Sequence, residues 1–261
     1  LQESLGCRLL EVRGRRAVLT PRGETLLARA RGLLDELRAL ETFASSLERG
    51  YEPALRLVVD VAFPRERLLA ALEQLRESCP HTRVDLAEAV LSGAEEAILD
   101  GAAQGTADLV VTSRVPPGFL GDWLYETTFV AVAAPSHPLH ALGRSVTRHD
   151  LEGHQQVVLR DSGTRAPRDE GFLGAQFRWT VGSLEASAAV VEAGLAYAWL
   201  PEHVVADALA AGRLRRLPVE AGATRKVPLY LVVVRPSEAG PATREAAARL
   251  HASAIAAPAR A

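Results

Sequence analysis

The spacing of apolar residues changes near residue 50 and divides the chain into two parts. Between residues 21 and 49 leucines recur every seven positions, which is typical of a coiled-coil helix. After residue 53 short apolar runs alternate with amphipathic segments, which indicates strands alternating with helices. No stretch approaches the roughly 20 consecutive apolar residues that a membrane-spanning helix needs, so a membrane partner is not expected.

The long helix is predicted to begin at Thr20 and Pro21 and to end at Gly50. Thr20 can cap the free N–H groups, and Pro21 suits the first helical position. One face carries an apolar seam, which predicts a dimerising coiled coil; a long helix packed on its own body is the alternative. The seam consists of Leu26, Ala30, Leu33, Leu37, Leu40, Ala44 and Leu47.

The region after residue 53 predicts an α/β fold with a parallel sheet. Three strands joined by two helices give a βαβαβ run with right-handed crossovers. These elements are expected at residues 55–62, 64–78, 83–89, 92–99 and 107–112. Ser92 is expected to cap the second helix and Gly101 to end it. Further strands are expected at 127–134, 157–160, 178–181, 195–200 and 227–235, and further helices at 183–193, at 201–211 and after Pro236.

Charge is distributed unevenly along the chain. The 261 residues carry a formal net charge of −2, yet residues 1–31 hold seven arginines against three glutamates. Residues 10–19 predict a two-stranded hairpin around Gly14, with Arg13, Arg15 and Arg16 at its tip. A basic tip on an acidic body favours an anionic partner, and an ordinary solvated face is the alternative.

The N-terminal segment resembles the end of the winged helix-turn-helix of LysR-type transcriptional regulators. That pattern is Leu-Gly-x-x-Leu-Phe-x-Arg-x-x-Arg, three residues, then Leu-Thr-x-Ala-Gly. The residues in register are Leu5, Gly6, Leu9, Arg15, Leu19, Thr20 and Gly23. The chain departs from the pattern at Leu10, Val12 and Arg22. Weaker matches follow in the same order at residues 134–139, 191–196 and 200–203.

This resemblance implies an architecture for the whole chain. Residues 1–20 would be the C-terminal remnant of a winged helix-turn-helix, whose DNA-reading helix precedes Leu1, and residues 21–50 a linker and dimerisation helix. The body would be two Rossmann-like subdomains similar to type II periplasmic binding proteins. Subdomain 1 would comprise residues 54–127 and 236–261, and subdomain 2 residues 136–226, with crossovers near 127–135 and 227–235.

The effector site is expected where strand ends and helix starts of both subdomains converge, because free N–H groups there attract anions. The pair Ser113 and Arg114 suggests a small carboxylate ligand. The candidates in the first subdomain are Ala62, Phe63, Pro64, Arg65, Thr112, Ser113 and Arg114. Those in the second are Asp161, Ser162, Gly163, Thr164, Gly182, Ser183, Leu184 and Trp199. Ser183 is equally a plain helix cap, and Arg114 equally a surface ion pair.

The function implied is a ligand-responsive bacterial transcription factor. Arg13, Arg15 and Arg16 would contact phosphates of double-stranded DNA, and without the reading helix binding would show no operator preference. The resemblance further implies a homodimer or homotetramer, RNA polymerase as a partner and a cytoplasmic location. The rival class is a periplasmic-type solute-binding protein for a small carboxylate.

Catalytic, metal and cofactor sites are not expected. Asp161-Ser162-Gly163 lacks the Gly-x-Ser-x-Gly elbow of hydrolases. No phosphate-binding loop or dinucleotide fingerprint occurs. His137, His140, His149 and His154 could in principle hold a metal, but the family pattern already explains His137.

Overall fold

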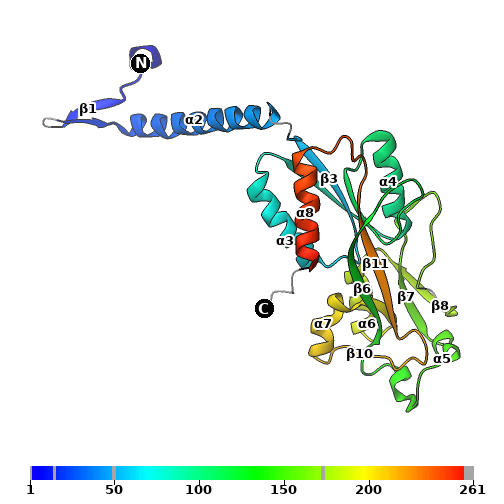
Figure 1. Cartoon of the computed structure of the whole chain (residues 1–261). Coiled ribbons are helices and arrows are strands. Elements are labelled where there is room, and N and C mark those ends of the chain that lie inside the picture. The colour runs from blue at the N-terminus through cyan, green and yellow to red at the C-terminus, as the bar shows by residue number, and fades with distance from the viewer. Residues whose placement is uncertain (1, 14–15, 49–50, 172–173, 256–261) are drawn as a thin grey trace. The chain divides into compact units, whose positions relative to one another are not determined.

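The computed structural model describes residues 2–13, 16–48, 51–171 and 174–255. The chain divides into two compact units, Leu1–Tyr51 and Glu52–Ala261, and Figure 1 labels most of their elements. Within the described ranges, no helix combines the length and the apolar composition needed to cross a bilayer. Gly14, Arg15 and Gly50 lie outside the described residues.

The N-terminal unit contains a hairpin and a long helix. Its elements are α1 (Gln2–Leu5), β1 (Leu10–Arg13), β2 (Arg16–Leu19) and α2 (Pro21–Glu48). β1 and β2 pair antiparallel, with Leu10 opposite Leu19. The predicted cap is confirmed, because Gly23 N–H donates to Thr20 Oγ1 at 3.0 Å.

The apolar seam of α2 is exposed within this unit. Leu33 is 55% and Leu37 51% exposed, and Ala30 and Ala44 are exposed as well. Leu26 is half-buried. Exposed leucines along one face of a long helix are typical of a surface that a partner covers. The side chains of Leu40 and Leu47 are outside the described set, and dimerisation stays a prediction.

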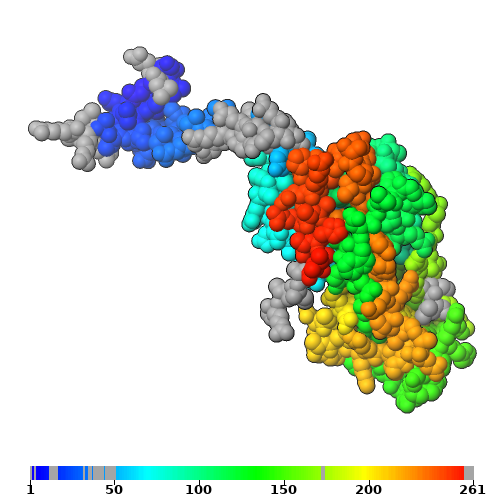
Figure 2. All heavy atoms as spheres, viewed as in Figure 1, coloured from blue at the N-terminus to red at the C-terminus, as the bar shows by residue number. Residues whose placement is uncertain are grey.

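The second unit contains a curled sheet of seven strands, in the order β10-β6-β11-β5-β3-β4 with β9 beside β6, and a separate pair of parallel strands, β7 and β8. β3 (Ala54–Asp60), β4 (Arg83–Ala89) and β5 (Leu109–Thr112) pair in parallel, as the βαβαβ run predicts. Alternate residues of β3 are buried because helices cover the sheet. These helices are α3 (Arg65–Ser78), α4 (Ser92–Gln104) and α8 (Pro241–Ile255). In Figure 2 the orange-red atoms of α8 lie beside the cyan atoms of α3.

Two long antiparallel strands, β6 (Asp122–Ala133) and β11 (Thr224–Val233), connect two lobes of this unit. The first lobe comprises β3, β4, β5, α3, α4 and α8. The second lobe comprises β7 (Gln155–Leu159), β8 (Phe177–Val181), β9 (Ala198–Pro201), β10 (Arg215–Arg216), α5 (Arg148–Glu152), α6 (Leu184–Glu192) and α7 (Glu202–Ala210). β11 pairs with β5 in the first lobe, and β6 pairs with β9 and β10 in the second. The subdomain bounds given above stay a prediction.

The sequence-based elements need correction at several places: β6 begins at Asp122 rather than 127, β11 begins at Thr224 rather than 227, and α4 also differs. α4 runs to Gln104 rather than 99, because Gly105 takes the left-handed conformation (φ +71°) that ends a helix. Gly101 lies inside α4, where a Cβ would come within 2.7 Å of Ala107 O. Ser92 is not the cap, since Leu91 precedes the helix and makes no side-chain cap bond. The structure also adds α5 and the 3₁₀ helix η1 (Pro138–Leu142).

Candidate functional site

A cavity of about 350 Å³ lies between the two lobes of the second unit. This volume is within the range of small-molecule sites, roughly 300–1,000 Å³. Its lining comes from strand ends and loops of both lobes: residues 60–62, 90–91, 113, 129, 156–159, 170–171, 184, 187, 199–200, 221–222, 224–225 and 227. A molecule held here would contact both lobes at once.

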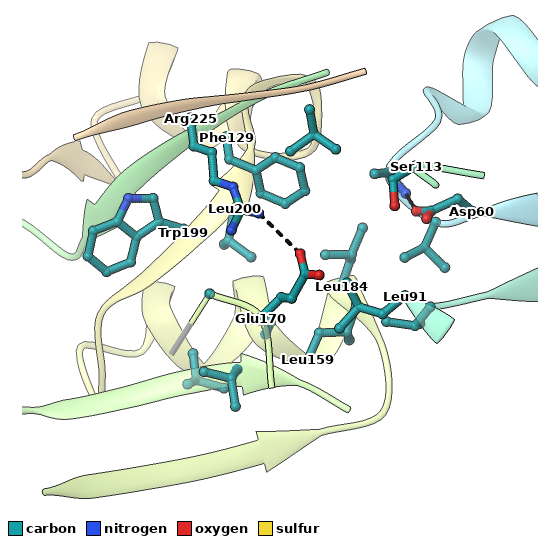
Figure 3. Close-up of a pocket in the computed structure, with 18 of the residues that line it drawn as sticks. Asp60, Leu91, Ser113, Phe129, Leu159, Glu170, Leu184, Trp199, Leu200 and Arg225 are labelled. Atoms are coloured by element: carbon teal, nitrogen blue, oxygen red, sulfur yellow. Dashed lines mark hydrogen bonds and ion pairs between the residues drawn. The ribbon is translucent and has the colours of Figure 1, made fainter. Parts of the chain in front are cut away.

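The walls of the cavity are largely apolar. Leu91, Leu159, Leu184 and Leu200 line it together with Phe129, and Figure 3 shows these side chains between its two ends. Leu91 has a φ of +51°, a conformation that L-residues rarely adopt and that costs about 1–3 kcal/mol. Among the described residues it is the only non-glycine with a positive φ. Strain is therefore concentrated at a residue of the cavity wall.

Polar groups lie at the two ends of the cavity (Figure 3). Asp60 and Ser113 lie at one end, and Arg225 and Trp199 at the other. Arg225 Nη2 forms an ion pair with Glu170 Oε2 at 3.1 Å. Trp199 Nε1 donates to the Gly222 carbonyl at 2.7 Å, which fixes the indole as a wall.

Asp60 is the buried acid of the site. It ends β3, and only 5% of the residue is exposed. Its Oδ1 accepts the Ala62 N–H at 2.9 Å. The pKa of Asp60 is raised to about 6, mainly because the buried carboxylate loses its hydration, with a smaller contribution from the charge of Glu170. The hydrogen bond from Ala62 and the charge of Arg168 act in the opposite direction.

A polar clasp joins the lobes beside the cavity; we use this name for residues 161–168 of the second lobe and residues 90–100 of the first. Ser162 Oγ accepts the Val90 N–H at 2.9 Å, and Ser162 N–H donates to Val90 O at 3.3 Å. Asp161 Oδ2 accepts the Ser92 hydroxyl at 2.7 Å and the Ser92 N–H at 3.3 Å. The Asp161 carboxylate thus occupies the start of α4, where the helix dipole favours an anion.

Acidic residues of α4 complete the clasp. Glu96 accepts N–H groups of Thr164 at 2.9 Å and of Arg165 at 2.7 Å, and these bonds lower the pKa of Glu96. Arg168 pairs with Glu95 and Arg165 with Asp100. The two segments approach so closely that a methyl group on Gly93 would lie 2.0 Å from Ser162 Oγ.

The structure brings four of the predicted effector residues to the cavity: Ala62, Ser113, Leu184 and Trp199. The other eleven do not line it. Asp161, Ser162, Gly163 and Thr164 belong to the clasp. Their hydrogen-bonding groups are used within the chain, which a reading of loop composition could not show.

The remaining predicted residues have structural roles near the cavity. Phe63 is buried against Tyr125, and Pro64 precedes α3. Arg65 bridges Glu88 and Glu185, whereas Arg114 lies 3.9 Å from Glu170. Thr112 is buried, and its hydroxyl donates to the Arg114 carbonyl. Gly182 and Ser183 precede α6, and Ser183 caps that helix by accepting the Ala186 N–H. The expectation of a carboxylate ligand rested on the pair Ser113 and Arg114, of which only Ser113 lines the cavity.

Sequence reasoning missed Asp60, Glu170 and Arg225, the charged residues of the lining. A signal for Asp60 was present, because it is an acidic residue at the end of an otherwise apolar strand. Arg225 was missed because β11 begins three residues earlier than expected. Glu170 comes from a loop without any periodic pattern.

The histidines considered as metal ligands form no such site in the described part of the chain. The rings of His137 and His154 lie with their centroids 5.3 Å apart and their planes tilted by 56°, and His137 Nδ1 accepts the Leu139 N–H. Burial lowers the pKa of His137 to about 4, so the ring is neutral at pH 7. No group of three or more metal-ligating side chains was found among the described residues.

Comparison with known proteins gives one consistent answer. Residues 48–254 match the family model of the LysR substrate binding domain. The HTH-type transcriptional regulator YhaJ of Escherichia coli O157:H7 is 30% identical over 220 residues, which cover 82% of this chain and 72% of YhaJ.

Solved structures agree in fold. The C-terminal domains of a LysR family protein from Agrobacterium tumefaciens align with a TM-score of 0.62 at 18% identity, covering 78% of this chain and 97% of that one. Full-length LysG from Corynebacterium glutamicum with bound effector Arg aligns with a TM-score of 0.59 at 18% identity, covering 97% and 85%. The predicted fold class is confirmed, and a solute-binding protein is not favoured.

Gly93→Ala is expected to loosen the clasp, because its methyl group would overlap Ser162 Oγ. Alanine also stabilises a helix by up to about 1 kcal/mol relative to glycine, and this gain would offset the loss at the clasp in the free energy of unfolding. Local hydrogen exchange is therefore a clearer readout than overall stability. Amide hydrogen exchange of residues 160–168 should become faster. Gly182→Ala is the matched control, since nothing lies within 4 Å of the added carbon. Equal exchange in the two variants would contradict the assignment of the clasp.

Asp60→Asn is expected to raise the free energy of unfolding at pH 8 by about 3 kcal/mol. The amide keeps an oxygen for Ala62 N–H but carries no charge to desolvate. Because burial raises the pKa of Asp60 from 3.8 to about 6, the gain should shrink as the pH falls through 6 and vanish below 3.8. Urea unfolding at several pH values measures this, with the exposed Asp85→Asn as the control. A gain independent of pH would refute the burial argument.

Proposed function

The chain belongs to the LysR-type family of transcriptional regulators, and we propose that it regulates transcription in response to a small molecule held in the cavity between its lobes. The observation that carries this proposal is the cavity itself: it is lined from both lobes, and its walls are apolar with polar groups at the ends. LysG, which has this fold, was solved with bound effector Arg.

The effector would act through the relative orientation of the lobes. A ligand shifts such an equilibrium only by its difference in affinity for two arrangements. Contacts to Asp60 and Ser113 in the first lobe and to Trp199 in the second would favour one arrangement. The clasp beside the cavity stabilises the arrangement seen here, so ligand and clasp act on the same equilibrium.

We propose that α2 pairs two copies through its apolar seam, as homodimers that can assemble further into homotetramers. The exposed leucines of the described part of α2 support this pairing. We further propose that the β1–β2 hairpin contacts DNA phosphates through Arg13, Arg15 and Arg16. Such contacts position a protein on DNA and carry little sequence information.

The role that we propose for the cavity is ligand binding and not catalysis. Glu170 is held by Arg225, and the relatives matched by this chain are regulators. Under this proposal, neither a metal nor an organic cofactor takes part.

Leu33→Asp is expected to weaken self-association at least tenfold, because it places a charge in the seam. The position is 55% exposed in the single chain, so the fold of the monomer should persist. Ala28→Asp adds the same charge on the outer face of α2 and serves as the control. Size-exclusion chromatography with light scattering over a dilution series measures the result. Monomers for both variants, or oligomers for both, would contradict the proposed seam.

Ser113→Phe is expected to abolish the transcriptional response, because the ring would fill one end of the cavity. The test expresses the protein in a bacterial strain, with a reporter driven by a promoter that it binds. Promoter occupancy, measured by chromatin immunoprecipitation, should stay unchanged while induction or repression is lost. Ser78→Phe, an exposed position on α3, is the control. A normal response of the Ser113→Phe variant would argue against the cavity as the effector site.

A further inference from the structure

Some of the charged residues that line the cavity have an ion-pair partner in the chain, and one does not. Among the lining residues three carry ionisable carboxylate or guanidinium groups: Asp60, Glu170 and Arg225. Arg225 is paired with Glu170 at 3.1 Å. Asp60 has no cation within 4.0 Å in the part of the chain that the structure describes. The cavity therefore offers one carboxylate whose charge the protein itself leaves unpaired.

The neighbouring arginines are already occupied. Arg168 lies 3.8 Å from Glu170 and also pairs with Glu95 in the clasp. Arg114 lies 3.9 Å from Glu170. Three guanidinium groups thus surround Glu170, and none of them pairs with Asp60. A carboxylate ligand would have to compete with Glu170 at one end and would meet Asp60 at the other.

Asp60 is placed to hold a ligand. It is 95% buried by the chain, and the Ala62 N–H bonded to Oδ1 is its one hydrogen-bond donor within the described residues. In Figure 3 its carboxylate lies beside Ser113 at the end of the cavity, with the apolar walls between it and Trp199. A buried carboxylate is stabilised when a cation with N–H donors pairs with it.

We propose that the effector is an amine with an apolar body, whose ammonium group pairs with the Asp60 carboxylate beside Ser113 and whose body lies against Phe129 and Leu184. This inference rests on the proposed function, because it names the chemical class of molecule for the same cavity. An ammonium group supplies both the missing charge and the missing donors. The aromatic and aliphatic walls select an apolar body, which extends toward Trp199.

Isothermal titration calorimetry on the full chain at pH 8 tests the proposal with matched probes. Benzylamine, phenethylamine and tryptamine are each compared with the alcohol and the carboxylate of the same skeleton. At least one amine should bind tenfold or more tightly than its alcohol and carboxylate counterparts. Asp60→Asn should lower the affinity for that amine tenfold or more and change the affinity for the alcohol less than threefold. Asp85→Asn, at an exposed ion pair, should leave all affinities unchanged.

Other outcomes overturn the amine assignment. It fails if no amine binds more tightly than its counterparts, or if amine binding survives Asp60→Asn in a variant that circular dichroism shows to be folded. Binding of an alcohol or a carboxylate, lost in Ser113→Phe, would leave the proposed effector cavity standing. If nothing binds and the Ser113→Phe reporter responds normally, the proposed function fails as well.

Discussion

The polar clasp between residues 161–168 and the start of α4 is the interaction on which the effector cavity depends. Its centre is the Asp161 carboxylate, which accepts from Ser92 in the first lobe and from the backbone N–H groups of Gly163 and Arg168 in its own. The loop that follows supplies Glu170 and Gly171 to the cavity lining. A helix start that could bind a free anion is thus filled by the protein's own carboxylate, and the space for a ligand lies beside it.

The cavity is kept at a cost to folding stability. Asp60 is buried with no ion-pair partner among the described residues, and Leu91, which lines the same cavity, holds a strained backbone conformation. Both unfavourable features line the same cavity rather than being distributed over the fold. A ligand that neutralises Asp60 would recover part of that cost on binding, which couples its affinity to the stability of the clasped arrangement.

Elements and fold class could be predicted from the sequence because periodicity and helix-ending residues are local. The βαβαβ run, the cap at Thr20 and the hairpin before it follow from such patterns. The site could not be predicted equally well. Asp161 to Thr164 look like an anion-binding loop, but their polar groups are used by α4, a partner about 70 positions away. Asp60 and Arg225 acquire their roles only when β3 and β11 meet around one cavity.

The central claim is that the clasp fixes the two lobes around the cavity, and the distance between the lobes tests it most directly. Spin labels at two exposed positions, Ala103 on α4 and Ala189 on α6, report it by double electron–electron resonance in a Cys7→Ser background. The full chain should give one narrow distribution, because the clasp fixes the lobes. Asp161→Ala should add a longer, broader component. An unchanged distribution in Asp161→Ala would contradict the account, since the lobes would then be held without the clasp.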